Sequence, residues 1–176
     1  LSPQKEWVDE AMRYAAEKGV LLVHAAGNNR MNNDSTAHYP SSYYLNRERI
    51  GNLLTVGAST YDSSLVASFS NYGKDAVDLF APGAMIYSTR NNNEESFASG
   101  TSAASPVVSG VAALIWSYYP DLTLEQVKAC IEGSVEPLGL EAPIPGLNET
   151  APFHTLSRTG GIVNAYRALQ LAEDMH

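Results

Sequence analysis

Cysteine is nearly absent from the sequence, which holds one, Cys130, among 176 residues. A single cysteine excludes an internal disulfide, and no Cys-x-x-Cys pair or Cys/His spacing typical of a zinc site occurs. We predict that Cys130 is a small buried side chain within a helix. Cysteine usage therefore does not decide between an oxidising and a reducing compartment.

Long apolar runs and basic clusters are also missing. The longest apolar stretch, residues 107–116, contains Ser109 and Gly110 and is shorter than the roughly 18 residues of a membrane-spanning helix. Acidic residues outnumber Lys and Arg by 19 to 11, so the net charge is −8. We therefore expect no membrane span, and we expect neither nucleic acid nor an anionic membrane as a partner.

The residues that are present describe one globular α/β domain over residues 1–176. An apolar share of 44% with a charged share of 17% excludes a disordered chain. Short apolar runs predict strands, of which those at 20–26 and 53–58 should be buried on both faces of a parallel sheet and those at 76–80 and 85–88 are shorter. Helical patterns occur at residues 3–18, 102–119, 121–133 and 162–173. This alternation predicts a layered fold with a mainly parallel sheet.

The predicted helices differ in their sequence signals. The first has Ser2 as N-cap, Pro3 at its first position and Gly19 after its end. Its apolar stripe consists of Trp7, Val8, Ala11, Met12 and Ala15. The helix at 102–119 is apolar nearly all round and should lie in the interior, whereas the next begins with a capping box of Thr123 and Gln126. Residues 134–160, rich in proline, are predicted to be an irregular insert.

Ser102 opens the most apolar helix. A helix N-terminus presents free N–H groups and a partial positive charge, so a serine oxygen there suits a nucleophile whose oxyanion needs stabilising. On this physics alone, a plain N-cap serine is the commoner interpretation. Ala104 stands where the Gly-x-Ser-x-Gly elbow of α/β-hydrolases needs glycine, which disfavours an esterase of that fold.

Asn28 follows a predicted strand directly after Gly27. In open α/β sheets, ligands bind beyond the carboxyl ends of the strands, so an amide at this position could face a cleft. Taken alone, a turn asparagine after glycine is the commoner interpretation.

The two segments together resemble the subtilase family of serine proteases. Gly-Thr-Ser-Ala-Ala-Ser-Pro at residues 100–106 resembles the nucleophile motif, and Ala-Ala-Gly-Asn at 25–28 resembles the oxyanion segment. Further segments resemble the family in the same order, and the resemblance covers about 1–133 and 160–173. They are Tyr-Pro at 39–40, residues 54–58, Ala-Ser-Phe-Ser at 67–70 with its extension to 73, residues 77–83 with Ala-Pro-Gly, and residues 161–165.

This resemblance implies the C-terminal half of a three-layer subtilisin-like fold and a serine endopeptidase acting on polypeptides. It implies that Ser102 is the nucleophile and that Asn28 and the Ser102 N–H hold the oxyanion. It also implies substrate-binding residues: Ala25, Ala26 and Gly27 in the wall of the pocket for the side chain before the scissile bond, His38 near its floor, and Thr101 beside the nucleophile. A secreted or cell-envelope location is expected from the same resemblance.

The family's remaining catalytic motifs, Asp-Ser/Thr-Gly and His-Gly-Thr, do not occur in this sequence. None of its histidines is followed by glycine, and we interpret His24 as a satisfied core residue and His154 as a surface residue. Asp34 and Asp62 are interpreted as solvated loop residues. We expect an upstream half of the domain to supply the base and its carboxylate, so that the isolated chain is inactive and could dimerise through an exposed sheet edge. The alternative is a non-catalytic pseudoprotease that binds partners.

No metal or cofactor is predicted from these residues. The family's stronger calcium site belongs to upstream segments. A weaker cation site near Tyr39-Pro40 uses backbone carbonyls, but the residues after Pro40 diverge from the family here. Structural calcium is therefore an expectation for the parent protein only.

Overall fold

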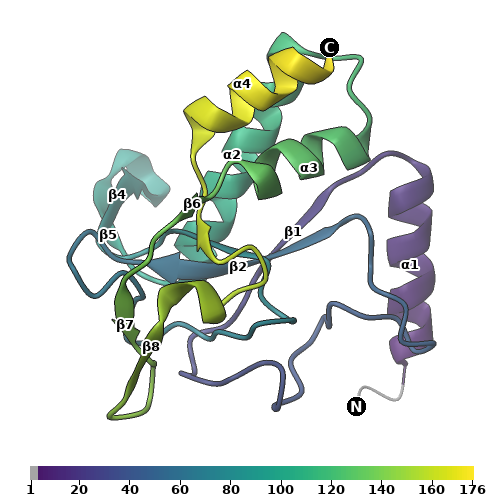
Figure 1. The fold of residues 1–176 in the computed structure, drawn as a ribbon. Coiled ribbons are helices and arrows are strands. Elements are labelled where there is room, and N and C mark those ends of the chain that lie inside the picture. The colour runs from purple at the N-terminus through teal and green to yellow at the C-terminus, as the bar shows by residue number, and fades with distance from the viewer. Residues whose placement is uncertain (1–3) are drawn as a thin grey trace.

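A computed structural model describes residues 4–176 as an α/β fold built on a mainly parallel five-stranded sheet (Figure 1). The strand order is β1-β2-β3-β9-β6, and only β6 runs antiparallel to its neighbour. The strands are β1 (Leu22–Ala25), β2 (Leu53–Ser59), β3 (Leu79–Pro82), β9 (Gly161–Ile162) and β6 (Glu136–Pro137). The predicted fold class is confirmed.

Three helices cover one face of the sheet (Figure 1). They are α2 (Thr101–Tyr118), α3 (Leu124–Gly133) and α4 (Ala165–Met175). Because side chains alternate along a strand, Leu79 and Ala81 of β3 point into this helical core, whereas Phe80 packs on the opposite face with Phe153. No helix among residues 4–176 is long and apolar enough to cross a membrane.

The helix α2 is buried on one side and exposed on the other, so the prediction that it lies wholly in the interior is wrong. Ala104, Val108 and Ile115 are fully buried against the sheet. Leu114 is 37% exposed and Tyr118 is 68% exposed, because sheet and neighbouring helices cover only one side of α2. The capping box of α3 is confirmed, since Thr123 accepts from the Gln126 N–H and the Gln126 side chain accepts in return.

The strand β1 also departs from its prediction. The strand β2 is buried throughout, as expected, but β1 is half-buried because it is the last strand of the sheet as described. The nearby helix α1 (Lys5–Glu17) buries Met12 and Asp9, while Trp7 in its predicted apolar stripe is 69% exposed. The predicted roles of Ser2 and Pro3 lie outside the described residues.

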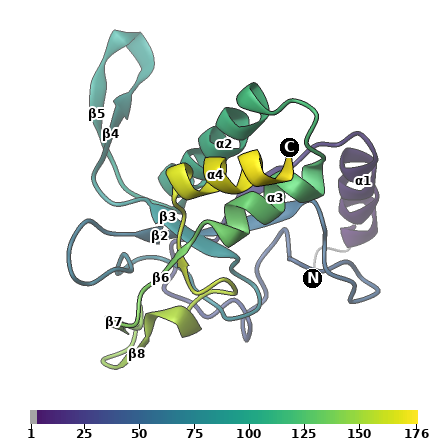
Figure 2. The ribbon, with the colours of Figure 1, turned by 45° about the horizontal axis from the view of Figure 1, so that its top comes forward.

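Two hairpins complete the fold. One, β4 (Ile86–Thr89) and β5 (Glu95–Ala98) around the short helix η1 (Asn91–Asn93), projects from the body (Figure 2). The other, β7 (Glu141–Pro143) and β8 (Thr150–Pro152), is followed by η2 (Phe153–Thr155). Residues 134–160 are therefore not irregular throughout. The sequence did not predict these strands because they are short, end in proline and carry no periodic pattern. Cys130 is buried and free, as predicted.

Candidate active site

Ser102 lies at the start of α2 and its neighbour Asn28 follows the carboxyl end of β1. Both side chains lie close to Gly100, which has a φ of 156°. A Cβ placed at Gly100 would lie 2.9 Å from Ser102 Oγ and 3.4 Å from Asn28 Nδ2. The hydroxyl of Ser102 and the amide nitrogen of Asn28 therefore lie around the same small region.

The amide of Asn28 is oriented by Thr101. Asn28 Oδ1 accepts from the Thr101 backbone N–H at 2.9 Å and from the Thr101 hydroxyl at 3.0 Å. The Thr101 hydroxyl in turn accepts from the Gly27 N–H at 3.1 Å. With its oxygen held in this way, Asn28 directs Nδ2 away from Thr101 and towards the side of Ser102.

Thr101 differs from the role predicted for it. Its side chain is 1% exposed and lies behind Asn28, so it offers no surface to a substrate. The sequence placed Thr101 with the substrate-binding residues because it adjoins Ser102. The structure makes it a positioning residue, and a hydroxyl next to a nucleophile was the only available signal for that.

The predicted pocket wall adjoins the predicted floor residue. Ala25 ends β1 and Ala26 follows it, but Ala26 is fully buried and, like Thr101, offers no side-chain surface to a substrate, so its predicted place in the wall is wrong. Gly27 has a φ of 108°. A Cβ placed at Gly27 would lie 3.0 Å from His38 Cε1 and 2.6 Å from Asn71 Nδ2. Only glycine allows this approach, which brings His38 against the segment that carries Asn28.

His24 and His38 form a stacked pair beneath this wall, with ring centroids 5.4 Å apart. The Nε2 atoms of both rings are buried, and neither has a hydrogen-bond partner within residues 4–176. Burial and the adjacent His38 lower the pKa of His24 to about 4, so its ring is neutral at pH 7. The interpretation of His24 as a satisfied core histidine is therefore wrong, because β1 is a half-buried edge strand that leaves Nε2 unpaired.

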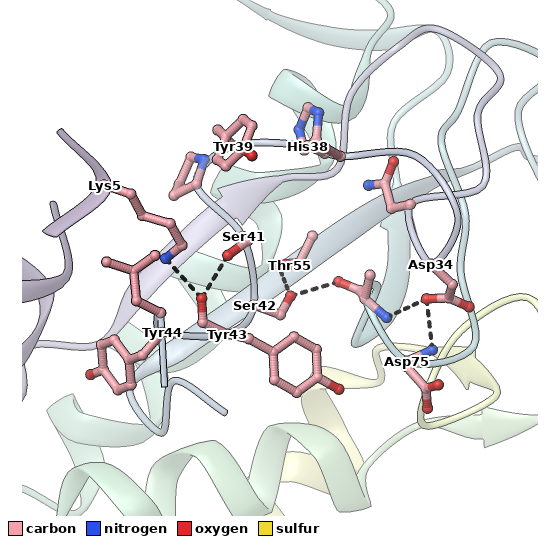
Figure 3. Close-up of a pocket in the computed structure, with 15 residues that line it drawn as sticks. Lys5, Asp34, His38, Tyr39, Ser41, Ser42, Tyr43, Tyr44, Thr55 and Asp75 are labelled. Atoms are coloured by element: carbon pink, nitrogen blue, oxygen red, sulfur yellow. Dashed lines mark hydrogen bonds between the residues drawn. The ribbon is translucent and has the colours of Figure 1, made fainter. Parts of the chain in front are cut away.

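A hollow of about 420 Å³ lies on the other side of His38, lined by the loop around Tyr39 (Figure 3). Here Lys5 Nζ donates to the Tyr43 carbonyl at 2.9 Å, and Ser41 Oγ donates to the same oxygen at 2.6 Å. Lys5 Nζ also pairs with Asp9 Oδ1 at 2.6 Å, so the Tyr43 carbonyl is engaged by an ion-paired ammonium and by the Ser41 hydroxyl. Within residues 4–176, no group of three or more His, Cys, Asp or Glu could hold a metal ion.

Asn71 fixes the loop that continues from Asn28. Its Oδ1 accepts from the backbone N–H groups of Asn29 at 2.8 Å and Met31 at 3.1 Å, while Arg30 N donates to the Phe69 carbonyl at 3.2 Å. Asn71 is 1% exposed, so these bonds are shielded from water. Sequence reasoning noted Asn71 only as part of a matching segment and missed this role.

The histidines of the described chain do not provide a base for Ser102. No hydrogen bond joins Ser102 to a histidine between residues 4 and 176. His154 is exposed, as predicted, and His176 packs against Tyr119 at the far end of α2.

Comparison with known proteins identifies the family. The model of the "Subtilase family" matches residues 2–160. Thermitase from Thermoactinomyces vulgaris is 34% identical over 163 residues, which cover 93% of this chain and 49% of that protein. A thermophilic serine proteinase from Bacillus sp. strain AK1 is 46% identical over 111 residues, covering 62% of this chain and 24% of that protein.

Solved structures agree with these sequence matches. The structure of the prenylagaramide maturation protease PagA superimposes with a TM-score of 0.72 at 30% identity, covering 95% of this chain and 56% of that one. The chain thus spans about a quarter to a half of the curated relatives named above. With a family match over residues 2–160 and the Ser102–Asn28 arrangement in place, the chain belongs to the subtilase family.

Proposed function

We propose that this chain is the nucleophile-bearing part of a serine endopeptidase. The observation that carries the proposal is the orientation of Asn28. Its oxygen is held by Thr101, while its amide nitrogen and the Ser102 hydroxyl oxygen lie 3.4 and 2.9 Å from the same point, a Cβ placed on Gly100. An oriented donor next to a hydroxyl at a helix N-terminus is the arrangement that acyl transfer through an oxyanion needs.

In the proposed reaction, Ser102 Oγ attacks the carbonyl carbon of a peptide bond and its proton passes to a histidine base. The carbonyl oxygen becomes an oxyanion that accepts from Asn28 Nδ2 and from the Ser102 backbone N–H. Collapse of this intermediate breaks the C–N bond, and the leaving amine takes the proton from the base. Water then attacks the acyl group on Ser102 by the same route and regenerates the hydroxyl.

The base and its orienting carboxylate come, in this proposal, from a segment outside residues 1–176, which is the principal partner of the chain. The half-buried edge strand β1 and the exposed Trp7 of α1 are surfaces that such a segment can cover. Without it, we propose that the chain is inactive and self-associates through the β1 edge. Sedimentation at increasing concentration tests the association.

The proposed substrate is a polypeptide, bound against Ala25 and Gly27 with His38 beneath. We propose that residues 1–176 need no metal of their own, a proposal supported by the lack, between residues 4 and 176, of any group of three or more His, Cys, Asp or Glu that could hold an ion. A location outside the cytoplasm is proposed from relatives such as the extracellular serine proteinase of Thermus sp. strain Rt41A.

The test is peptide hydrolysis by the complete catalytic domain and its variants. Ser102→Ala should abolish turnover. Asn28→Ala should lower kcat by about 10²–10³ with little change in KM, a loss known from subtilisin itself rather than derived from this structure. A complete domain that binds peptide without cleaving it would support the pseudoprotease alternative instead.

A further inference from the structure

The hairpin β7–β8 reaches the loop that carries the oxyanion amide. Its base is held by Ala142 and Phe153, both fully buried in a cluster with Phe80 on the sheet face opposite the helices. Its tip is closed by backbone bonds, from Ile144 N to Glu149 O at 2.9 Å and from Leu147 N to Ile144 O at 3.1 Å. The hairpin is therefore a firmly attached arm rather than a loose insertion.

The tip of this hairpin packs on Arg30. Gly146 has a φ of 84°, and a Cβ placed on it would lie 3.0 Å from both the Cβ and the carbonyl oxygen of Arg30. Arg30 has a φ of 61°, which is uncommon for a residue other than glycine. With Arg30 N bound to the Phe69 carbonyl, the backbone of Arg30 is held from two sides.

The side chain of Arg30 carries an uncompensated charge. Arg49 and Arg158 pair with Asp78, and Arg167 pairs with Glu136. The exposed guanidinium of Arg30, like those of Arg47 and Arg90, makes no ion pair or hydrogen bond with any residue of the described range 4–176, but Arg30 alone of these three lines a hollow. A fixed backbone with a free, planar cation is suited to binding a carboxylate from another molecule.

A hollow of about 560 Å³ accompanies this cation, formed by Arg30, residues 60–68 and the hairpin tip at 143–148. The other charge lining it is Asp62, whose Oδ1 accepts from the Thr60 hydroxyl at 2.6 Å and the Ser64 N–H at 2.9 Å. These bonds, that from Thr60 above all, hold the pKa of the Asp62 carboxyl below its usual range. Asp62 therefore keeps its negative charge, but its carboxylate is bonded within its own turn, and no ion pair joins it to Arg30 among residues 4–176.

Arg30 is also close to the reacting atoms. Only Asn29 lies between it and Asn28, so their Cα atoms are at most about 7 Å apart. With the length of the arginine side chain added, the guanidinium lies no farther from a scissile bond at Asn28 than the length of about four extended residues.

We propose that Arg30, supported by the β7–β8 hairpin, is a specificity-determining residue that binds an acidic side chain of the polypeptide substrate close to the scissile bond. The inference rests on the proposed protease function and adds the substrate class: acidic peptides are preferred over otherwise identical neutral ones. Screening by salt should weaken this preference, because the guanidinium is exposed.

The test compares quenched peptides that differ only by Glu, Gln or Lys at one position, scanned across both sides of the scissile bond, with the complete catalytic domain. We expect Glu to be preferred over Gln at one position by about tenfold in kcat/KM, mainly through KM. Arg30→Ala should remove the preference, Arg30→Lys should restore part of it, and Arg30→Glu should favour Lys. Arg47→Ala is the matched control, because Arg47 is also exposed with a positive φ of 67°.

A second pair of variants tests the hairpin. Gly146→Ala should reduce the Glu preference by displacing Arg30, whereas Gly139→Ala, with nothing within 4 Å of an added Cβ, should not. An active enzyme that shows no Glu preference, or that keeps it in Arg30→Ala, would overturn the inference.

Binding of the same peptides to the Ser102→Ala protein, followed by fluorescence anisotropy, separates the two proposals. Arg30-dependent binding of the Glu peptide by a domain that never cleaves would refute the protease proposal alone and keep Arg30 as a carboxylate-binding residue. Equal binding of the Glu and Gln peptides, together with normal cleavage by the unmutated domain, would refute the role of Arg30 alone.

Discussion

Asn28 Oδ1 accepts hydrogen bonds from both the backbone N–H and the hydroxyl of Thr101, at 2.9 and 3.0 Å. This relationship explains how an exposed asparagine at the end of an edge strand keeps a fixed orientation. Thr101, the residue before the proposed nucleophile, thus orients the proposed oxyanion donor, and its buried side chain links the segment after β1 to the start of α2.

Thr101→Val tests this link, because valine keeps the shape of threonine without the hydroxyl. Loss of the bond to Asn28 should cost about 1 kcal/mol of transition-state stabilisation, or roughly fivefold in kcat, with KM little changed. Thr101→Ser, which keeps the hydroxyl, should retain most of the activity. Equal kcat in the Val and Ser variants would contradict the positioning role.

Gly27→Ala should destabilise the domain. The substitution places a methyl group 2.6 Å from Asn71 Nδ2 at a φ of 108°, so the backbone and Asn71 cannot both keep their places. We expect a loss of about 1–3 kcal/mol in the free energy of unfolding, measured by urea denaturation. Gly51→Ala, where an added Cβ meets nothing within 4 Å, is the control and should change stability little.

The His24–His38 pair predicts acid sensitivity. In the unfolded chain His24 takes up a proton near pH 6.5, but in the folded chain only near pH 4. Between pH 6.5 and pH 4 the unfolded state therefore binds more protons than the folded state. The free energy of unfolding is unaffected by His24 above pH 6.5 and falls as the pH drops towards 4, by at most about 3 kcal/mol. His24→Leu should reduce this loss, whereas the exposed His154→Gln should not. An unchanged pH dependence of unfolding in His24→Leu would show that the pair is not responsible.

Asp78 should be a major contributor to stability. Its carboxylate is 1% exposed, accepts from the Thr55 N–H at 2.7 Å and pairs with Arg49 at 2.6 Å and Arg158 at 2.8 Å. Asp78→Ala leaves these donors without an acceptor and should cost about 2–4 kcal/mol. Glu136→Ala, which breaks the exposed pair with Arg167, should cost less than about 1 kcal/mol in the same denaturation experiment. Similar losses for the two variants would contradict this ranking.

Some features of the fold and the site could be predicted from the sequence because they depend on residues close together in the chain. The capping box at Thr123 and the buried strand β2 carry their own signals, and Ser102 and Asn28 stand in recognisable motifs. The half-buried state of β1 could not be predicted, since a strand's neighbours are decided by pairing across the sheet rather than by its own residues.

The positioning residues were hidden for a related reason. Thr101 and Asn71 act through bonds to residues distant in sequence, and the only local signal was the position of the Thr101 hydroxyl beside Ser102. The hairpin β7–β8 was not predicted, because strands of three residues that end in proline show no measurable hydrophobic period. Contacts between residues far apart in the sequence could therefore not be predicted.

Ser102 is proposed to be a nucleophile whose base lies outside residues 1–176. The most direct measurement is stoichiometric labelling with a fluorophosphonate, with the modified residue mapped by mass spectrometry. We predict one label per molecule on Ser102 in the complete domain, none in Ser102→Ala, and none in the chain of residues 1–176 alone. Labelling of another residue in the complete domain, or rapid labelling of Ser102 in the isolated chain, would contradict the account.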